Sequence, residues 1–272
     1  MTQTEIPTLE DIDSAFAALV LPDFSDEFDQ FDELDQANQP NQPNQFDLHE
    51  LSRSGADLSG YLAIHQAMRV ANEQLVQGIG TAPVADPKRA AALGRWFRGY
   101  SDELRTHHHI EDDIVFPQLV ERVPAYAEYN DALTDDHHYL DRVIDALRDA
   151  LADWARHGAE SDSARDARYR ALDLAVELRD FLDEHLAIED ADVLPMIERH
   201  FTADEYVVLE KQAGKAITIR QAMFTAPWYM ATVDAKTAAR TLREAPRALR
   251  IVYAVSRRSY ARLVANAFGG RP

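Results

Sequence analysis

The sequence predicts an all-α protein, an antiparallel up-down-up-down four-helix bundle with additional helices after it. Four segments of about 22–35 residues carry apolar side chains at helical spacing. The loops between these segments are short, which favours antiparallel neighbours. Each of the four apolar stripes also includes a histidine, so the predicted core contains imidazoles. Together these observations predict a bundle whose interior is partly polar.

Composition narrows the class of protein. The chain has 272 residues, of which 46% are hydrophobic and 28% are charged, as expected for a soluble globular protein with a sizeable core. Its formal charge of -19 speaks against a nucleic-acid binder, because phosphate would be repelled. The absence of cysteine excludes disulfides, thiolate zinc sites and ordinary iron–sulfur clusters. Any metal must therefore be held by nitrogen and oxygen ligands.

The N-terminus lacks the basic-then-apolar pattern of a signal peptide, and no apolar run approaches the length of a membrane span. We therefore expect a cytoplasmic protein with no membrane partner.

Three regions are expected. Residues 1–50 are acidic and contain no Lys or Arg, and residues 23–47 are rich in Asp, Asn, Gln and Pro. Such a segment buries too little apolar surface to offset its ordering entropy, so we expect a mostly disordered tail with one short helix near residues 9–20. Residues 51–200 form the predicted bundle, and residues 201–272 form a C-terminal helical extension.

The first bundle helix is predicted from about Ala56 to Ile79, with His65 on its apolar stripe. The second is predicted from about Lys88 to Val120. His107 and Glu111 share the stripe of the second helix, and Pro117 is expected to kink or end its last turn.

The third helix is predicted from about Asp131 to His157. His137 belongs to its apolar stripe, whereas His138 shares a face with acidic residues and should point to solvent. The fourth helix is predicted over about 163–198, with His185 and Glu189 directed inward.

Residues 201–272 are expected to form further helices, near 205–218, 223–233 and 247–268. The last of these is basic, so the chain is acidic at its beginning and basic at its end. A contact between the two ends, within one chain or in a homodimer, is one interpretation, and a protein partner is another. A solvated basic face remains the plain alternative.

One segment of the sequence occurs twice. Residues 107–117 read HHHIEDDIVFP and residues 185–195 read HLAIEDADVLP, with His, Ile, Glu, Asp, Val and Pro at the same offsets. In each copy the His precedes the Glu by four residues, which places both on one helix face.

These patterns predict a metal centre. Burying four imidazoles and two carboxylates without compensating charge would cost several kcal/mol for each charged group, and a pair of cations would remove that cost. Imidazole and carboxylate ligands suit iron, manganese or zinc. Six protein groups leave open positions on two metals, which indicates small-molecule chemistry. The candidate ligands are His65, His107, Glu111, His137, His185 and Glu189.

Over about residues 56–200, these ligands and the trailing Pro117 and Pro195 resemble the hemerythrin-like (HHE cation-binding) domain. The resemblance implies an antiparallel four-helix bundle that holds two non-haem iron ions with an oxo or hydroxo bridge. It also implies O2, peroxide or nitric oxide as the small ligand. The sequence departs from the oxygen carriers at Asp141, where they have a second histidine, and at Glu189, where they have a shorter Asp arm.

Several neighbours of the candidate ligands have open roles. His108 could donate a hydrogen bond to the site or lie at the surface, and Asp141 could be a weak seventh ligand or a polar neighbour. Tyr61 and Tyr100 could donate to a bound oxygen species or be ordinary core aromatics. Asp112 and Asp190, which follow the two glutamates, could orient ligands.

The favoured function is binding of O2 or a related ligand, or sensing of iron or redox state. The alternative is a di-iron enzyme that breaks down peroxide or activates O2 to oxidise a small substrate. An organic substrate would need a pocket, which the aromatic segment 223–233 could cover.

Overall fold

The computed structural model describes residues 55–157 and 161–270. These residues are helical apart from short connections, and no strand occurs among them, so the all-α prediction is confirmed. The expected N-terminal helix and disordered tail lie outside the described residues. No helix among those described is long and apolar enough to cross a membrane.

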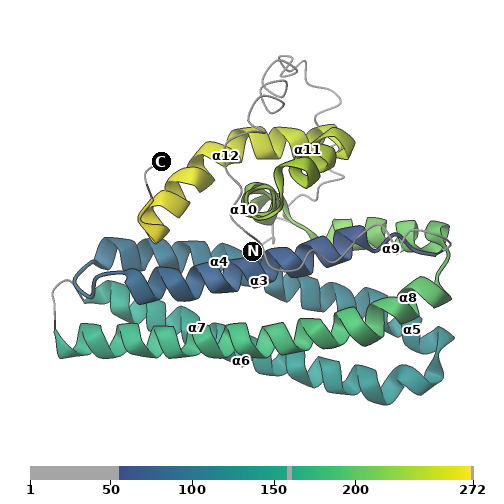
Figure 1. Cartoon of the computed structure of the whole chain (residues 1–272), viewed down its shortest axis with the longest axis horizontal. Coiled ribbons are helices and arrows are strands. Elements are labelled where there is room, and N and C mark those ends of the chain that lie inside the picture. The colour runs from purple at the N-terminus through teal and green to yellow at the C-terminus, as the bar shows by residue number, and fades with distance from the viewer. Residues whose placement is uncertain (1–54, 158–160, 271–272) are drawn as a thin grey trace, which may run out of the picture.

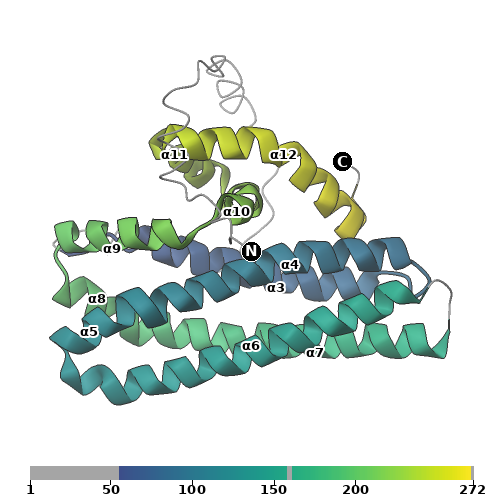
Figure 2. The ribbon, with the colours of Figure 1, turned by 180° about the vertical axis from the view of Figure 1, so that it is seen from behind.

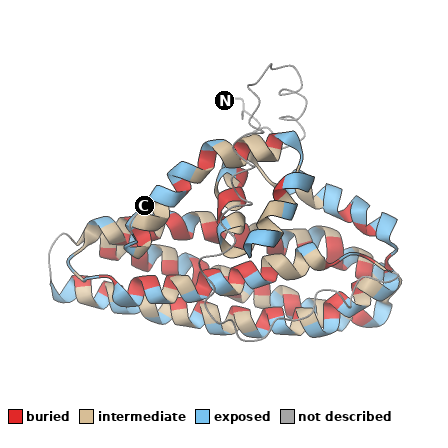
Figure 3. Ribbon diagram, turned by 45° about the horizontal axis from the view of Figure 1, so that its top comes forward, coloured by how far each residue is buried: buried red, intermediate tan, exposed pale blue. Residues whose placement is uncertain are grey.

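Four long helices lie side by side and form what we call the bundle (Figures 1 and 2). Helix α3 packs against α4 and α7, and α6 packs against the same two helices, so each contacts two neighbours. Buried residues line their inner sides (Figure 3). The four helices are α3 (Ser59–Thr81), α4 (Pro87–Ile110), α6 (Ala127–Arg156) and α7 (Asp162–Ile188).

Local sequence signals explain where two of these helices start. Asp86 accepts a hydrogen bond from the backbone N–H of Arg89 at 3.0 Å, and Pro87 occupies the first turn of α4, where its missing N–H costs nothing. Ser161 caps α7 in the same way, through the backbone N–H of Ala164 at 3.1 Å.

The two copies of the repeated segment form π-helical turns. The turn η2 (Glu111–Val115) joins α4 to α5 (Phe116–Arg122), and η4 (Glu189–Val193) joins α7 to α8 (Leu194–His200). Pro117 therefore does not end the helical segment, which was predicted to reach about Val120 and continues to Arg122. In η2 the N–H of Phe116 bonds to the carbonyl of Glu111, five residues back. This wider turn makes room for a proline that lacks an N–H and would otherwise clash with the preceding turn.

A short 3-10 turn, η3 (Pro124–Tyr126), leads from α5 into α6. The third bundle helix therefore starts four residues before the predicted Asp131.

One small apolar cluster lies within the extension, and the core of the bundle consists of two others. The larger one lies inside the bundle and contains Trp96, Phe97 and Trp154. The smaller one lies around α5, α8 and α9 and contains Phe116 and Phe201. The candidate ligands lie near the boundary between the two clusters, as on α4 and η2, where Leu104 of the larger cluster precedes His107 and Val115 of the smaller cluster follows Glu111. They therefore form a polar layer between two apolar ones.

Four further helices follow the bundle. Three helices of the extension were predicted. The helix over 235–244 was not predicted, because it buries a single apolar residue, Leu242, and therefore has no apolar stripe in its sequence. Helices α10 and α12 pack against each other and against α4, so the extension lies along one side of the bundle (Figure 1). The four helices are α9 (Ala203–Ala216), α10 (Ile219–Thr232), α11 (Ala235–Glu244) and α12 (Arg247–Phe268).

Two glycines of the bundle receive aromatic rings from the extension. A Cβ atom at Gly78 would lie 2.6 Å from the ring of Phe268, and one at Gly99 would overlap the ring of Phe224. Next to them, the indole N–H of Trp96 donates to the hydroxyl of Tyr260 at 3.2 Å. The extension is thus fitted closely to α3 and α4.

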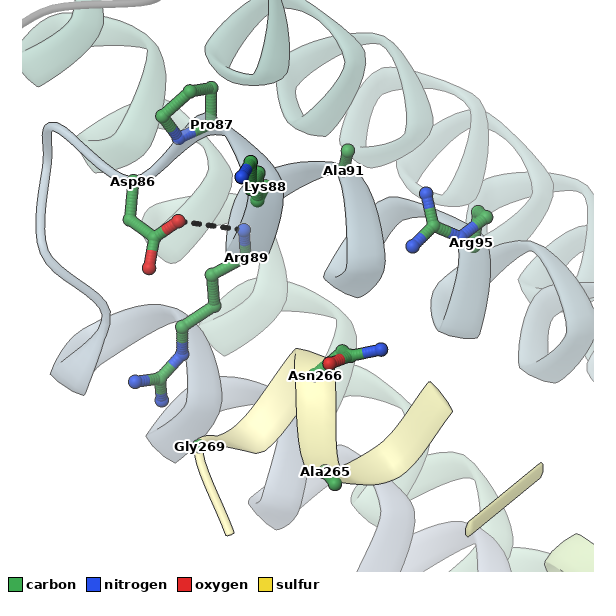
Figure 4. A pocket seen from close by; sticks show the side chains of 9 residues that line it. All are labelled: Asp86, Pro87, Lys88, Arg89, Ala91, Arg95, Ala265, Asn266 and Gly269. Carbon is green, nitrogen blue, oxygen red and sulfur yellow. Dashed lines mark hydrogen bonds between the residues drawn. The ribbon is translucent and has the colours of Figure 1, made fainter. Parts of the chain in front are cut away.

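Arg89 closes the end of α12. Its guanidinium points towards the end of that helix (Figure 4), where Nε lies 3.1 Å from the carbonyl of Ala267 and Nη2 lies 3.3 Å from that of Phe268. A positive charge at this place also interacts favourably with the negative end of the helix dipole. Gly269 follows with φ of +76°, the left-handed conformation that ends many helices.

Polar contacts between α10 and α4 lie one turn from the candidate ligands. Glu103 is buried, and its carboxylate accepts hydrogen bonds from Gln221 at 3.1 Å and from Thr225. Gln221 also donates to Thr106 at 2.8 Å. The extension therefore holds the segment of α4 that directly precedes His107.

Candidate metal centre

The structure brings the six candidate ligands together in the layer between the two apolar clusters. All six side chains are buried. His65 comes from α3 and His137 from α6, while the two His-Glu pairs come from the ends of α4 and α7 and the π turns that follow. Their donor atoms fall into two groups.

Group one consists of His65, His107, Glu111 and Glu189, whose donor atoms lie within 4.8 Å of one another. The Nε2 atoms of His65 and His107 are 3.1 Å apart. Glu111 places Oε1 at 3.0 Å from Nε2 of His107, and Glu189 places Oε2 at 3.5 Å from Nε2 of His65. Two nitrogens and two oxygens therefore converge.

Group two consists of His108, His137 and His185. The Nε2 atoms of His137 and His185 are 3.0 Å apart. The second oxygen of each glutamate faces this group: Oε2 of Glu111 lies 3.6 Å from His137, and Oε1 of Glu189 lies 3.3 Å from His185. Each carboxylate thus faces group one with one oxygen and group two with the other.

The aspartate that follows each glutamate holds a histidine of another helix. Asp112 lies 3.0 Å from Nδ1 of His137, and Asp190 lies 2.7 Å from Nδ1 of His65. Arg69 fixes Asp190 in turn, at 2.8 Å. Such contacts orient an imidazole so that its other nitrogen faces a metal. The ligand-orienting role that the sequence suggested for both aspartates agrees with these contacts.

His108 was missed as a member of the cluster. It is 4% exposed, its ring stacks on that of His137 at 4.2 Å with 7° between the planes, and neither ring nitrogen has a hydrogen-bond partner. It is therefore neither a surface residue nor a donor to another side chain. The spacing of three residues between His108 and Glu111 is a helical-face spacing, and it was the available signal.

Three other polar residues near the ligand positions lie outside both groups. Asp141 forms an ion pair with Arg105 at 2.9 Å and its side chain is 41% exposed, so it is a polar neighbour and not a member of either group. His138 is exposed, as expected. The hydroxyl of Tyr100 lies 3.0 Å from the carbonyl of Met68 and 2.9 Å from Asn72, away from the cluster.

Tyr61 does lie at the cluster. Its hydroxyl donates to Oε1 of Glu111, and its ring packs edge-on against His65 at 4.9 Å and His107 at 5.5 Å. Burial and the nearby glutamates raise the pKa of Tyr61 well above its ordinary value, so the phenol keeps its proton. A hydrogen-bond donor therefore stands beside group one.

The pKa values of Glu111 and His185 show that the buried carboxylates and imidazoles stabilise each other's charged forms. Burial alone would raise the pKa of Glu111, but the imidazoles of His107 and His137 outweigh it and lower the pKa below its ordinary range. Burial lowers the pKa of His185, but the carboxylate of Glu189, 3.3 Å from its Nε2, outweighs this and brings the pKa to about 9. The buried carboxylates are thus stabilised by positive charge on imidazole, and a metal cation would compete with protons for the same nitrogens.

The donor set fits one or more metal ions. Oε2 of Glu111 and both oxygens of Glu189 are buried without a hydrogen-bond partner, as are both nitrogens of His108. Orphaned groups of this kind are costly unless something binds them. Imidazole nitrogens and carboxylate oxygens are ordinary ligands for iron, manganese and zinc. The cluster therefore has the chemistry of a metal centre.

Two hollows in the described surface lie elsewhere. One of about 670 Å³ lies between the start of α4 and the end of α12 (Figure 4), and one of about 310 Å³ lies beside Phe224 of α10. Neither is lined by a residue of the cluster. The aromatic residues of α10, which could have covered a substrate pocket in the enzyme alternative, pack against α4: Trp228 is buried against Tyr100, and the ring of Phe224 lies on Gly99.

Comparison with known proteins gives one match. A family model described as the hemerythrin HHE cation binding domain matches residues 57–197, slightly more than half of the chain. No curated protein and no solved structure matches. The matched residues run from the start of the bundle into α8 and contain every residue of the two groups, whereas helices α9–α12 lie outside them.

Proposed function

We propose, from the premise that the chain belongs to the hemerythrin HHE cation-binding family, that its buried cluster holds two iron ions and binds O2 or a related small ligand, or senses iron or redox state. The observation that carries the proposal is the orientation of Glu111 and Glu189. Each turns one oxygen to group one and the other to group two, an arrangement in which both groups could share the carboxylate.

In this proposal each group of imidazoles serves one metal. His65 and His107 would hold one ion, and His108, His137 and His185 would hold the other, with both glutamates shared. Bound iron would supply redox chemistry and open positions for a small ligand. Group one has two imidazoles and group two has three, so group one would leave more room for a small ligand, next to Tyr61.

The residues around the cluster would control binding without contacting the metals. Asp112 and Asp190 keep Nδ1 of two imidazoles occupied, so that Nε2 is the nitrogen that faces the centre. The two apolar clusters on either side exclude water, which strengthens every electrostatic interaction in the layer. Tyr61 supplies a hydrogen-bond donor to a small ligand that carries oxygen or nitrogen.

Metal content tests the proposal. Aerobically purified protein, grown with ample iron, should contain about two iron ions per chain by mass spectrometry, with charge-transfer absorption in the near ultraviolet. Replacing Glu111 or Glu189 by Ala should reduce this content to one or none, because the shared ligand is lost. His138→Ala, which removes an exposed imidazole one residue from His137, is the matched control and should keep both ions. Retention of two ions in both glutamate variants would refute the shared role.

A second candidate function is breakdown of peroxide or oxidation of a small substrate, and the position of Tyr61 favours it. The hydroxyl of Tyr61 donates to Oε1 of Glu111 beside group one, and it could instead donate this hydrogen bond to a peroxide held there. Steady-state consumption of peroxide or O2 would establish the enzyme, whereas a stoichiometric and reversible spectral change would establish the binding protein. In the enzyme, Tyr61→Phe should lower turnover and leave iron content unchanged.

A further inference from the structure

The last two helices carry basic residues on an acidic chain. Residues 235–270 contain eight Lys and Arg and one Glu, while the whole chain has a formal charge of -19. On α12, five residues at steps of three or four lie on one helix face. We call this face the basic stripe, and its members are Arg247, Ile251, Val255, Arg258 and Arg262.

The basic stripe faces away from the bundle. The opposite side of α12 provides the buried residues Val252, Ser256 and Tyr260 and packs against α4 and α10. On the stripe the three arginines are exposed, Ile251 is half-buried, and Val255 is 63% exposed. The stripe therefore presents two aliphatic side chains with arginines on both sides. A surface of this kind fits an acidic segment that also carries large apolar side chains.

The chain itself contains such a segment. Residues 1–50 hold thirteen Asp and Glu, five Phe and no Lys or Arg. Acidic and Phe residues are most concentrated in residues 23–35. There, Phe24, Phe28 and Phe31 are spaced by four and three residues, with acidic residues between them. Steps of four and three also separate the members of the basic stripe, so apolar and charged positions can match along the two segments.

The connection between the two segments is long enough. Twenty-four residues separate Phe31 from Gly55, where the described part of the chain begins, and an extended chain of that length spans roughly 80 Å. The longest bundle helix, α6, has 30 residues and is therefore roughly 45 Å long. The acidic segment can thus reach α12 from either end of the bundle.

We propose that residues 23–35 bind the basic stripe of the same chain, with the Phe rings on Ile251 and Val255 and the carboxylates on the arginines. Binding within one chain is favoured over an external polyanion for two reasons. The rest of the chain is strongly acidic and repels phosphate, and a tethered segment is present at millimolar effective concentration. The proposal is independent of which metal the cluster holds.

Cross-linking in the full chain tests the contact. Because the chain has no native Cys, Gln30→Cys and Ala261→Cys introduce the only two thiols. Under mild oxidation at low salt we expect an intrachain disulfide to form rapidly. Replacing Arg247, Arg258 and Arg262 by Glu should slow its formation about tenfold or more, as expected when several charge pairs become repulsive, and 1 M salt should slow it as well. The matched control replaces three exposed arginines outside the extension, Arg156, Arg170 and Arg199, and should leave the rate unchanged.

Three results would overturn the proposal. Equal disulfide rates in the stripe variant and the control would show that the arginines do not bind the segment. Disulfides that join two chains, in place of intrachain ones, would assign the stripe to a second copy. The third concerns a short DNA duplex or vesicles rich in phosphatidylserine. Their affinity is measured for the full chain and for a variant in which the Asp and Glu residues within 23–35 are replaced by Asn and Gln. If the DNA or the vesicles bind both proteins with the same affinity, residues 23–35 do not occupy the stripe.

Discussion

Three consecutive histidines, His107, His108 and His109, have three different environments because successive residues on a helix turn by about 100°. His107 belongs to group one, His108 to group two, and His109 is exposed. The two buried imidazoles therefore reach different halves of the cluster from adjacent positions. At the scale of single residues, this pair sets the difference between group one and group two, because the second copy of the repeat has Leu186 where the first has His108.

In the proposed centre, replacing His108 by Ala should remove the iron ion of group two or strongly weaken its binding. The reason is that the substitution removes one of the three imidazoles of group two. Iron content after dialysis against a chelator measures this. His109→Ala changes the neighbouring exposed imidazole and should leave iron content unchanged. If the His108 variant retains both ions through dialysis, His108 is a packing residue stacked on His137.

Asp112 and Asp113 form a second matched pair. Asp112 contacts His137 and also accepts from Thr134 at 2.9 Å, whereas Asp113 is exposed. Asp112→Asn should weaken metal affinity about 10- to 100-fold, as is typical when the partner of a ligand imidazole is changed. Asp113→Asn should have no effect. Competition with a chromophoric chelator gives both affinities, and equal values would mean that Asp112 does not orient His137.

At the scale of helices, α4 connects the cluster to the extension. It carries His107 and His108 at its end, the buried Glu103 one turn earlier, and Gly99 one turn before that. Contacts from α10 reach both Glu103 and Gly99. The extension and the candidate metal centre therefore both contact α4, within two turns of each other.

Gly99→Ala should loosen the extension without removing the metal. The added methyl overlaps the ring of Phe224, and overpacking of this kind costs about 1–3 kcal/mol. Hydrogen exchange should rise in α10–α12 and stay unchanged in α6 and α7. Gly60→Ala is the control, because a Cβ there meets nothing within 4 Å, and it should stabilise α3 by about 0.5–1 kcal/mol. Unchanged exchange in the Gly99 variant would show that Phe224 can move aside at little cost.

At the scale of the whole molecule, helical periodicity predicted the all-α class and placed His65, His137, His185 and the two glutamates on the buried faces. It could not predict the π turns, because it assumes a constant 3.6 residues per turn, and those turns are where Glu111 and Glu189 lie. Periodicity also failed to identify His108 as a member of the cluster. It assigns one buried face to each helix, whereas α4 packs against both α3 and α6 and buries a wider face. The position of the extension depends on Gly78 and Gly99, whose lack of a side chain carries no periodic signal.

The contacts of Asp112 and Asp190 have a consequence for how such a chain could arise. Each half of the bundle is a helical hairpin with one lone histidine and one His-Glu-Asp run, and the Asp of each hairpin holds the lone histidine of the other. A homodimer of one such hairpin, related by a two-fold axis, would already contain both shared carboxylates and both orienting aspartates. Duplication and fusion of its gene would then leave single positions free to diverge, and His108 opposite Leu186 is such a position.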